Sequence, residues 1–295
     1  MAEKTLVIKN LKKYFGKTKA VDGISIEIEE GEIYGFLGPN GAGKTTAIRC
    51  LMDFLRPDSG SITVFGLDAR ADSVSIKEKV GFLPSDMYLH RDWTGLEHIE
   101  FVRAVRGEKY EYKDLARKLD YDVRIKTKNL STGNRQKLGL ILALMVNPSF
   151  LILDEPTRGL DPLLQNVFYK ILEDFRAQGG TVFMSSHILP EIERVCDKVA
   201  IIREGKIVGV EVVDEFKKST LHLVTVRFTS SSDKANFKVP GSEIVDQLDD
   251  GVLLKIRGDL NPLLKELAKY SIKDLSLDHS SLEDLFLSFY EKKGE

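Results

Sequence analysis

This sequence has few cysteines and no long apolar run, and each scarcity excludes a class of protein. Only two cysteines occur, Cys50 and Cys196, and both lie in apolar helical patterns. We therefore expect buried free thiols in a reducing compartment rather than a disulfide or a metal site. The longest apolar run, residues 138–146, is about half of the roughly 18 residues that a membrane helix needs. Residues 1–4 lead straight into an expected strand, so we expect neither a secretory signal nor a transmembrane segment.

Net charge is also nearly absent. The 295 residues include 43 Lys or Arg and 45 Asp or Glu, which gives a formal net charge of −2. This balance argues against a protein that coats nucleic acid through bulk charge, and we predict no nucleic-acid partner. Hydrophobic residues make up 42% of the chain and charged residues 30%, which is typical of a soluble globular protein. The length suits one large domain or two smaller ones.

What the sequence does contain is a glycine-rich segment between a predicted buried strand, residues 33–37, and a predicted helix that opens at 46–52. The segment fits the phosphate-loop pattern G-x-x-x-x-G-K-[ST] and consists of Gly38, Pro39, Asn40, Gly41, Ala42, Gly43, Lys44 and Thr45. A glycine-rich bend at a helix start points backbone N–H groups at a polyphosphate. We expect Lys44 to reach the β- and γ-phosphates and the Thr45 hydroxyl to bind Mg²⁺.

A second predicted buried strand, residues 150–155, ends in two carboxylates. They would lie at the edge where α/β sheets bind ligands. We predict that Asp154 holds Mg²⁺ through water and that Glu155 polarises the water that attacks the γ-phosphate. Another predicted strand, residues 181–187, ends in His187. A lone histidine there is more often structural, but its place at the same sheet edge makes it a candidate γ-phosphate sensor.

An aromatic pair near the N-terminus is ambiguous on local pattern. Residues 5–9 and 24–28 are predicted to form an antiparallel pair, joined by a loop that holds Tyr14 and Phe15. Phe15, with Tyr14 as the second choice, would offer a flat apolar face on which a purine base can stack. The alternative, which the pattern favours equally, is that both aromatic side chains only pack the sheet.

Start signals mark two helices. Thr94 with Glu97 forms a capping box before a predicted helix at 95–105. Ser131 is placed to cap a strongly apolar helix that we expect to end at Val146. The Ser-Thr-Gly at that start is either a second phosphate site or, as is commoner, a plain cap.

In their order, these motifs resemble the nucleotide-binding subunit of ABC transporters. The resemblance covers residues 4–218 and rests on five motifs, namely the phosphate loop, the signature-like segment 130–134, the strand with two carboxylates, the turn at 159–161, and His187. It implies an α/β P-loop NTPase core of the ABC ATPase type, a RecA-like mixed sheet with an antiparallel β subdomain and an α-helical subdomain at about 86–147. We accordingly predict an ATP-binding domain at 1–218 and a smaller domain at 219–295.

The resemblance also implies a composite site for ATP and Mg²⁺. In the family, two subunits pair head to tail, and each ATP lies between the phosphate loop of one and the signature of the other. The implied catalytic residues are Glu155, the switch histidine His187, and Lys44. The other implied contacts are the phosphate loop with Thr46, the adenine-stacking Phe15, the signature residues Ser131 and Gly133, and the dimer-contacting Asp161. An isolated chain should therefore hydrolyse ATP slowly.

The signature of this chain departs from the family pattern. The family usually has Leu-Ser-Gly-Gly-Gln, whereas Thr132 and Asn134 differ here. Ser131 and Gly133, the residues placed to touch phosphate, are kept. The departure leaves the implied nucleotide contacts of the signature in place.

A second departure follows the predicted strand at 80–84. Ser85 stands where the family has glutamine or, in one branch, glutamate. In the family that residue joins the Mg²⁺ shell and relays motion toward the membrane partner. Ser85 is therefore a doubtful metal ligand, and the neighbouring Asp86 is the alternative.

Residues 219–295 are predicted to form a small α+β domain. The pattern predicts strands at 221–228, 251–256 and 272–277, and helices at 261–270 and 281–290. Residues 281–287 resemble the closing motif of the ABC-2 type exporter branch. The domain is either a packing or dimer-stabilising cap or a ligand sensor, and the lack of a binding motif favours the cap.

These resemblances lead to one leading functional hypothesis. The chain would be the ATP-hydrolysing motor subunit of an exporter, peripheral at the cytoplasmic face of the membrane, working with a second ATP-binding subunit, identical or different, and with separate integral-membrane permease subunits. One rival is a soluble ABC ATPase acting on ribosomes or DNA, but the chain has a single cassette and no sustained heptad between 44 and 130. The other is a nucleotide-gated regulator with weak hydrolysis, supported only by Ser85.

Overall fold

The computed structural model describes residues 3–107, 110–218, 221–230, 237, 242–257 and 260–279. The chain divides into two compact units, Met1–Glu211 and Val212–Glu295. The division falls at the end of strand β10 (Lys206–Val212), a few residues before the boundary that the sequence pattern predicts after residue 218.

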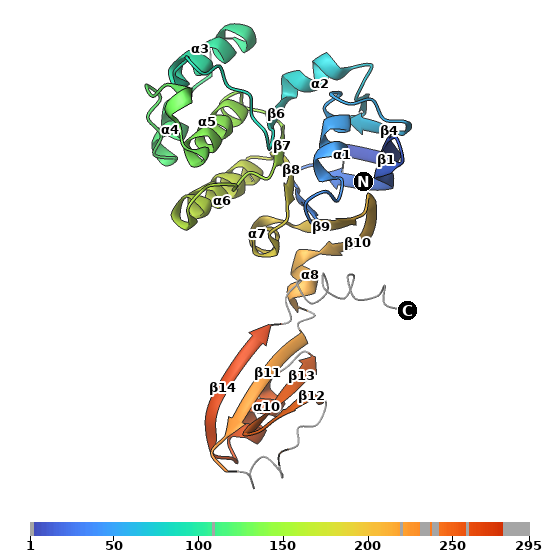
Figure 1. The fold of residues 1–295 in the computed structure, drawn as a ribbon, viewed down its shortest axis with the longest axis vertical. Helices are drawn as coiled ribbons and strands as arrows, with labels where there is room; N and C mark the ends of the chain where they lie inside the picture. The colour runs from blue at the N-terminus through green and yellow to red at the C-terminus, as the bar shows by residue number, and fades with distance from the viewer. Residues whose placement is uncertain are drawn as a thin grey trace. The chain divides into compact units, whose positions relative to one another are not determined.

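A six-stranded sheet forms the centre of the first unit (Figure 1). Its order is β10-β9-β3-β8-β7-β6, with β3 at Ile33–Leu37, β6 at Val80–Leu83, β7 at Phe150–Asp154, β8 at Thr181–Ser186 and β9 at Lys198–Arg203. Strands β6, β7, β8, β3 and β9 pair in parallel. Every position of β3, β7 and β8 is buried, as expected of parallel strands covered on both faces.

The carboxyl ends of these strands meet at one edge of the sheet. Because β7, β8 and β3 are direct neighbours, the segments that follow them are adjacent there: Glu155 after β7, His187 after β8, and the phosphate loop, residues 38–45, after β3. This edge is where open α/β sheets bind ligands.

A second, antiparallel sheet has the order β2-β1-β4-β5, with β1 at Lys4–Phe15, β2 at Thr18–Glu29, β4 at Ser59–Val64 and β5 at Leu67–Asp68. The predicted antiparallel pair is therefore confirmed, and both strands are longer than expected. The predicted loop that holds Tyr14 and Phe15 is wrong. Both residues belong to β1, and Phe15 pairs with Thr18 across a turn made by Gly16 and Lys17. The alternation that marks the strands fades before their ends, where β1 is only partly buried.

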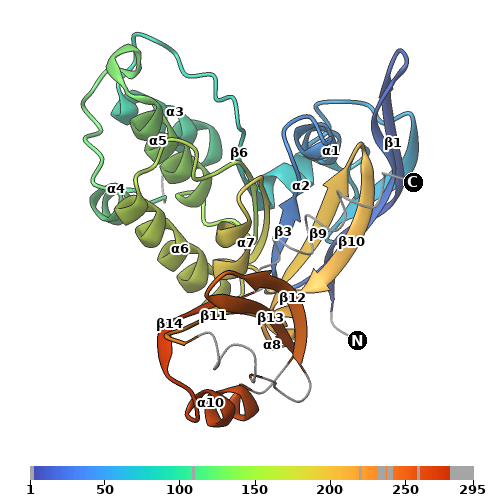
Figure 2. The same cartoon turned by 60° about the horizontal axis from the view of Figure 1, so that its bottom comes forward.

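Helices surround the central sheet. They are α1 (Lys44–Leu51), α2 (Ser73–Lys79), α3 (Gly95–Arg106), α4 (Lys113–Lys118), the 3₁₀ turn η1 (Thr127–Asn129), α5 (Thr132–Leu144), α6 (Pro162–Ala177) and α7 (Leu189–Val195). Figures 1 and 2 show α3, α4 and α5 gathered on one side of the unit, within the range predicted for a helical subdomain.

Both predicted helix caps are present. The Thr94 hydroxyl accepts the Glu97 N–H at 3.2 Å, and the Glu97 carboxylate accepts the Thr94 N–H at 2.6 Å, which completes the capping box. The Ser131 hydroxyl accepts the Asn134 N–H at 3.2 Å at the start of α5. Helix α5 ends at Leu144, slightly before the expected end at Val146.

The hydrophobic core of the first unit joins its two sheets. Side chains from the antiparallel sheet, from helix α1 and from the central sheet form one buried cluster, which includes Leu6, Ile28, Phe36, Ile48, Phe150 and Phe183. Full burial of side chains of this size stabilises by about 1.5–3 kcal/mol each. The phosphate loop and α1 are thereby attached to a rigid scaffold. Cys50 and Cys196 are buried and free, as predicted.

The second unit contains a four-stranded antiparallel sheet of order β12-β13-β11-β14. Its elements are α8 (Val213–Lys218), β11 (Leu221–Phe228), β12 (Ser242–Leu248), β13 (Gly251–Arg257), α10 (Asn261–Leu267) and β14 (Ile272–His279). The three predicted strands are present. The sequence pattern missed β12, because this strand is largely exposed and its apolar residues do not alternate with polar ones. The predicted helix at 281–290 lies outside the described residues.

Across the described residues, no helix is both long enough and apolar enough to cross a lipid bilayer.

Candidate active site

The phosphate loop passes so close to neighbouring backbone that two of its positions require glycine. A Cβ atom on Gly38 would lie 2.4 Å from the Ile202 carbonyl oxygen. Gly43 has a φ of 112°, and a Cβ there would lie 2.2 Å from the Ala20 carbonyl oxygen. The loop can therefore follow this path between β2 and β9 only with glycine at both positions.

Lys44 begins helix α1 and is almost fully buried. Its Nζ donates to the Gly38 carbonyl oxygen at 2.5 Å and to the Pro39 carbonyl oxygen at 3.2 Å. The same ammonium lies 3.1 Å from Oε1 of Glu155. Three oxygen atoms, from the segments that follow strands β3 and β7, thus bind this ammonium group. They offset the unfavourable position of a cation at the positive end of the α1 dipole.

Thr45 and Asp154 join the phosphate loop to the end of β7. The Thr45 hydroxyl donates to Oδ2 of Asp154 at 2.8 Å, and the Ser185 hydroxyl donates to Oδ1 at 2.6 Å. Asp154 is 1% exposed, so these hydroxyls satisfy an otherwise costly buried carboxylate. Sequence reasoning missed Ser185. The sequence places its hydroxyl at the next-to-last position of a buried strand. The register that pairs Ser185 with Asp154 appears only in the structure.

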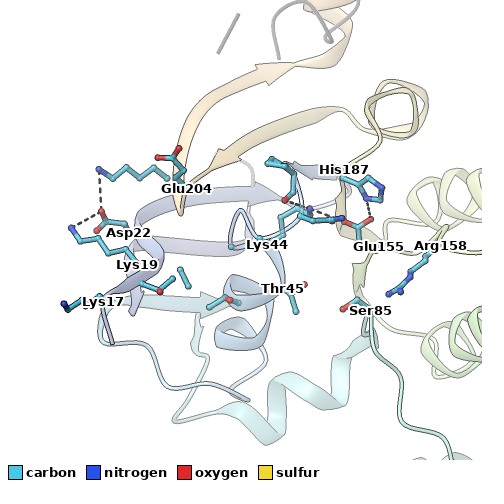
Figure 3. Close-up of a pocket in the computed structure, with 18 residues that line it drawn as sticks. Lys17, Lys19, Asp22, Lys44, Thr45, Ser85, Glu155, Arg158, His187 and Glu204 are labelled. Atoms are coloured by element: carbon cyan, nitrogen blue, oxygen red, sulfur yellow. Dashed lines mark hydrogen bonds and ion pairs between the residues drawn. The ribbon is translucent and has the colours of Figure 1, made fainter. Parts of the chain in front are cut away.

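Glu155 and His187 face each other across the sheet edge. His187 Nδ1 lies 2.6 Å from Oε2 of Glu155, while Oε1 of the same carboxylate faces Lys44. Glu155 adopts a left-handed backbone conformation with a φ of 54°, which is uncommon for a residue with a side chain. Its N–H donates to the Ser185 hydroxyl at 3.1 Å. The carboxylate is thus fixed between a lysine and a histidine (Figure 3).

These groups line a cavity of about 1050 Å³. Of the predicted site residues, the structure brings ten into its wall: Pro39, Asn40, Gly41, Gly43, Lys44, Thr45, Thr46, Ser85, Glu155 and His187. The wall also contains residues that the motif analysis did not single out: Lys17, Thr18, Lys19, Ala20, Asp22, Arg158, Glu204 and Lys206. Basic side chains outnumber acidic ones in this wall, which suits a polyanionic ligand.

Two of the remaining predicted residues support the cavity from behind. Gly38 supplies a carbonyl to Lys44, and Asp154 holds Thr45. Ala42 is a buried residue of the loop itself. Phe15 is half exposed and does not line the cavity; the Lys13 ammonium lies 5.5 Å from the centroid of its ring. The second choice, Tyr14, donates its hydroxyl to Asp22 at 2.5 Å, so base stacking stays a prediction for either residue.

The signature residues and Asp161 lie outside the cavity wall. Ser131 is exposed and caps α5, and Gly133 is partly exposed. Asp161 is exposed and caps α6, since its carboxylate accepts the N–H groups of Leu163 and Leu164, both at 3.0 Å. Within the one described chain, these three residues do not line the cavity next to the phosphate loop.

The position that departs from the family pattern is also part of the wall. Ser85 lines the cavity near Arg158 (Figure 3). Asp86 is exposed, and its carboxylate lies 3.8 Å from the Arg158 guanidinium. An ion pair this exposed is worth little, about 0–1 kcal/mol.

Comparison with known proteins places this chain in one family. The family model described as ABC transporter matches residues 21–158. An uncharacterised ABC transporter ATP-binding protein of Methanocaldococcus jannaschii is 33% identical, over 92% of this chain and 97% of that protein. The bacitracin transport ATP-binding protein of Bacillus licheniformis is 32% identical, over 94% of each.

The solved structures agree on the fold. A dimeric structure of a bacterial ABC transporter cassette superposes with a TM-score of 0.66 at 21% identity, covering 70% of this chain and 98% of that one. The family model, the relatives and the fold thus indicate the same family. The chain belongs to the ATP-binding proteins of ABC transporters and is an ATPase subunit of that family.

Proposed function

We propose that this chain is the motor subunit of an exporter, and that it hydrolyses ATP in the cavity at the phosphate loop. The single observation that carries the proposal is the Glu155 carboxylate, held between Lys44 and His187 at the sheet edge. A base, a cation and a phosphate loop at one edge are the groups that phosphoryl transfer requires.

The triphosphate would lie on the N–H groups of the loop and of the start of α1. No side chain caps that helix start and no acidic residue lies in its first turn, which suits an anionic ligand there. Phosphate oxygens would replace the Glu155 carboxylate as partners of Lys44. In that exchange Glu155 is freed to act on water, and Lys44 keeps its charge compensated.

The oxygen donors at Thr45 and Asp154 would suit a Mg²⁺ ion. The hydroxyl of Thr45 and the carboxylate of Asp154 are hard oxygen donors, 2.8 Å apart, and Mg²⁺ prefers such oxygens together with water and phosphate. Thr45 would bind the ion directly and Asp154 through water. When bound, Mg²⁺ neutralises charge that develops on the β- and γ-phosphates. Ser85 is the third candidate because it lines the same wall.

Glu155 would act as the general base. As the oxygen of a water molecule bonds to the γ-phosphorus, the carboxylate accepts the proton, the bond from the γ-phosphorus to the β-phosphate oxygen breaks, and ADP and phosphate leave. The role of His187 is to hold Glu155 in place and to contact the γ-phosphate. The left-handed backbone of Glu155 is a cost that the surrounding hydrogen bonds offset.

The active unit would be a head-to-tail dimer around two ATP molecules. Ser131, Gly133 and Asp161 lie outside the cavity wall of their own chain, which supports a role at the phosphate loop of a second chain. The helix start capped by Ser131 is a suitable place for the γ-phosphate of that second site. A dimeric cassette exists among the structures with this fold.

The transport step would take place in separate membrane subunits at the cytoplasmic face of the membrane. The closing motif at 281–287 supports the export direction, and the relative named as a bacitracin transport ATP-binding protein supports a transport role. No described helix of this chain can itself span the bilayer. The C-terminal sheet is proposed as a packing or dimer-stabilising unit.

Purification from membranes tests the proposal. We expect the tagged chain, solubilised in detergent, to bring down an integral-membrane protein together with a second ATP-binding chain, and the complex to hydrolyse ATP faster than the isolated chain. Recovery with ribosomes or DNA, and no membrane protein, would contradict the transport role while leaving the ATPase assignment in place.

A further inference from the structure

The helix that begins at the signature also contacts the catalytic turn of the same chain. Gln136 lies on α5, one turn after Ser131, and is 6% exposed. Its side-chain Nε2 donates to the Pro156 carbonyl oxygen at 2.8 Å and to the Glu155 carbonyl oxygen at 3.2 Å. Both neighbours are acceptors only, so the amide nitrogen must face them. We infer that Gln136 is a positioning residue for Glu155.

The two hydrogen bonds bind a segment whose backbone has left the strand conformation. Glu155 has a φ of 54°, so its peptide groups are rotated out of the strand conformation of β7. Its N–H is held by Ser185 on one side, and its carbonyl oxygen by Gln136 on the other. These contacts fix the direction of the Glu155 side chain, whose carboxylate must lie between Lys44 and His187.

A second contact links the same two segments. A Cβ atom on Gly133 would lie 2.5 Å from the Gly159 carbonyl oxygen, so the first turn of α5 packs directly on the turn at 157–161. Gly159 has a φ of 79°, and a Cβ there would lie 3.0 Å from Cγ2 of Thr132. The start of α5 and the segment after Glu155 are therefore in direct contact.

This geometry has a consequence that rests on the proposed head-to-tail dimer. Ser131 and Gly133 would contact the ATP of the second chain, whereas Glu155 acts on the ATP of its own chain. Because α5 is a continuous helix from Thr132 to Leu144, a nucleotide that pulls on its start also moves Gln136. Closure of one composite site would thus set the orientation of the general base in the other.

Two variants test the positioning role in the purified full-length chain. Gln136→Met keeps the length of the side chain and removes both N–H groups. Gln136→Glu replaces the donor by an oxygen that repels the two carbonyl groups. We expect kcat for ATP to fall at least about 10-fold in both, since small displacements of a catalytic group are costly. Affinity for a fluorescent ATP analogue with Mg²⁺ should change less than about threefold, because the phosphate loop is untouched.

The control variant is Gln165→Ala. Gln165 also uses its side-chain Nε2 to bind a turn carbonyl at 3.2 Å, but the carbonyl is that of Leu160 and not that of Glu155 or Pro156. We expect its kcat to stay within about twofold of wild type. An equal loss of kcat in the control would show general loosening of the turn and would overturn the inference. So would unchanged kcat in either Gln136 variant, or loss of ATP binding in both.

A double-mutant cycle tests the link to the second site. Ser131→Ala and Gln136→Met should lower kcat less than additively when combined, because both act through α5. Full additivity would overturn the link between sites. A wild-type chain without ATPase activity would overturn the proposed function and this inference with it. Unchanged kcat in the variants beside an active wild type would overturn the inference alone.

Discussion

Lys44 Nζ and Glu155 Oε1 lie 3.1 Å apart, one at the start of α1 and the other just after β7, with side chains that are 6% and 15% exposed. At this burial the two charges compensate each other, since a lone buried charge is costly. A nucleotide that binds Lys44 must therefore compete with Glu155. The pair thus joins phosphate binding to the release of Glu155, the proposed general base.

Replacing Glu155 by glutamine should separate binding from hydrolysis. The amide cannot accept a proton from water, so we expect kcat for ATP to fall about 100-fold or more. ATP binding should persist, and the uncleaved nucleotide should stabilise a dimer. Steady-state ATPase assays and size-exclusion chromatography with saturating ATP and Mg²⁺ measure both effects. A variant that stays monomeric under these conditions would remove the head-to-tail model.

Replacing Ser85 by glutamine should restore the side chain that the family has at this wall of the cavity. An added amide oxygen in the cavity wall that also contains Thr45 should raise turnover or lower the Mg²⁺ concentration for half-maximal activity, by up to about 10-fold. A Mg²⁺ titration of ATPase activity measures this. No change would mean that water, Asp86 or another residue already fills the role, and Asp86→Asn in the wild-type background tests that second possibility.

Two glycines of the phosphate loop should respond differently to alanine. Gly41 and Gly43 both have positive φ, but only Gly43 has a backbone oxygen within 4 Å of the added Cβ. We expect Gly43→Ala to lower the free energy of unfolding by about 2–4 kcal/mol and Gly41→Ala by about 1–2 kcal/mol. Urea unfolding without nucleotide measures the difference. Equal losses would show that the close approach to Ala20 is not what limits this position.

Replacing Glu191 by glutamine should change how stability depends on pH. Glu191 is 4% exposed, and burial raises the pKa of its carboxyl group above the ordinary 4.5, although the hydroxyls of Thr157 and Ser186 donate to it. The folded protein therefore holds this proton more tightly than the unfolded chain does. The contribution of Glu191 to stability is fully present below pH 4.5 and is lost as the pH rises through the folded-state pKa.

The expected outcome is that Glu191→Gln gains stability relative to wild type as the pH is raised from about 5 to about 8. Chemical unfolding of both proteins at several pH values checks this. A stability difference that does not change with pH would show that Glu191 titrates alike in the folded and unfolded states.

Much of the fold follows from local patterns. The glycine-rich segment between a buried strand and a helix, and the strand that ends at Asp154, have short-range signals that tertiary contacts do not override. The caps at Thr94 and Ser131 are also local, because the donor lies three residues from the acceptor. In contrast, the strand β12 exposes most of its side chains, Ile244 and Val245 among them, and its apolar residues do not alternate with polar ones, so no periodicity reveals it.

The candidate site also combines features that the local sequence predicts with contacts that only the tertiary structure shows. The sequence by itself determined which residues are predicted to carry the chemistry, because a phosphate loop and a pair of strand-end carboxylates are patterns of adjacent residues. Only the tertiary structure decided their partners: Ser185 beside Asp154, Gln136 behind Glu155, and Lys44 facing Glu155. These pairs depend on strand order and register and on how α5 packs against the turn. Such contacts join residues far apart in the chain, where no sequence period records them.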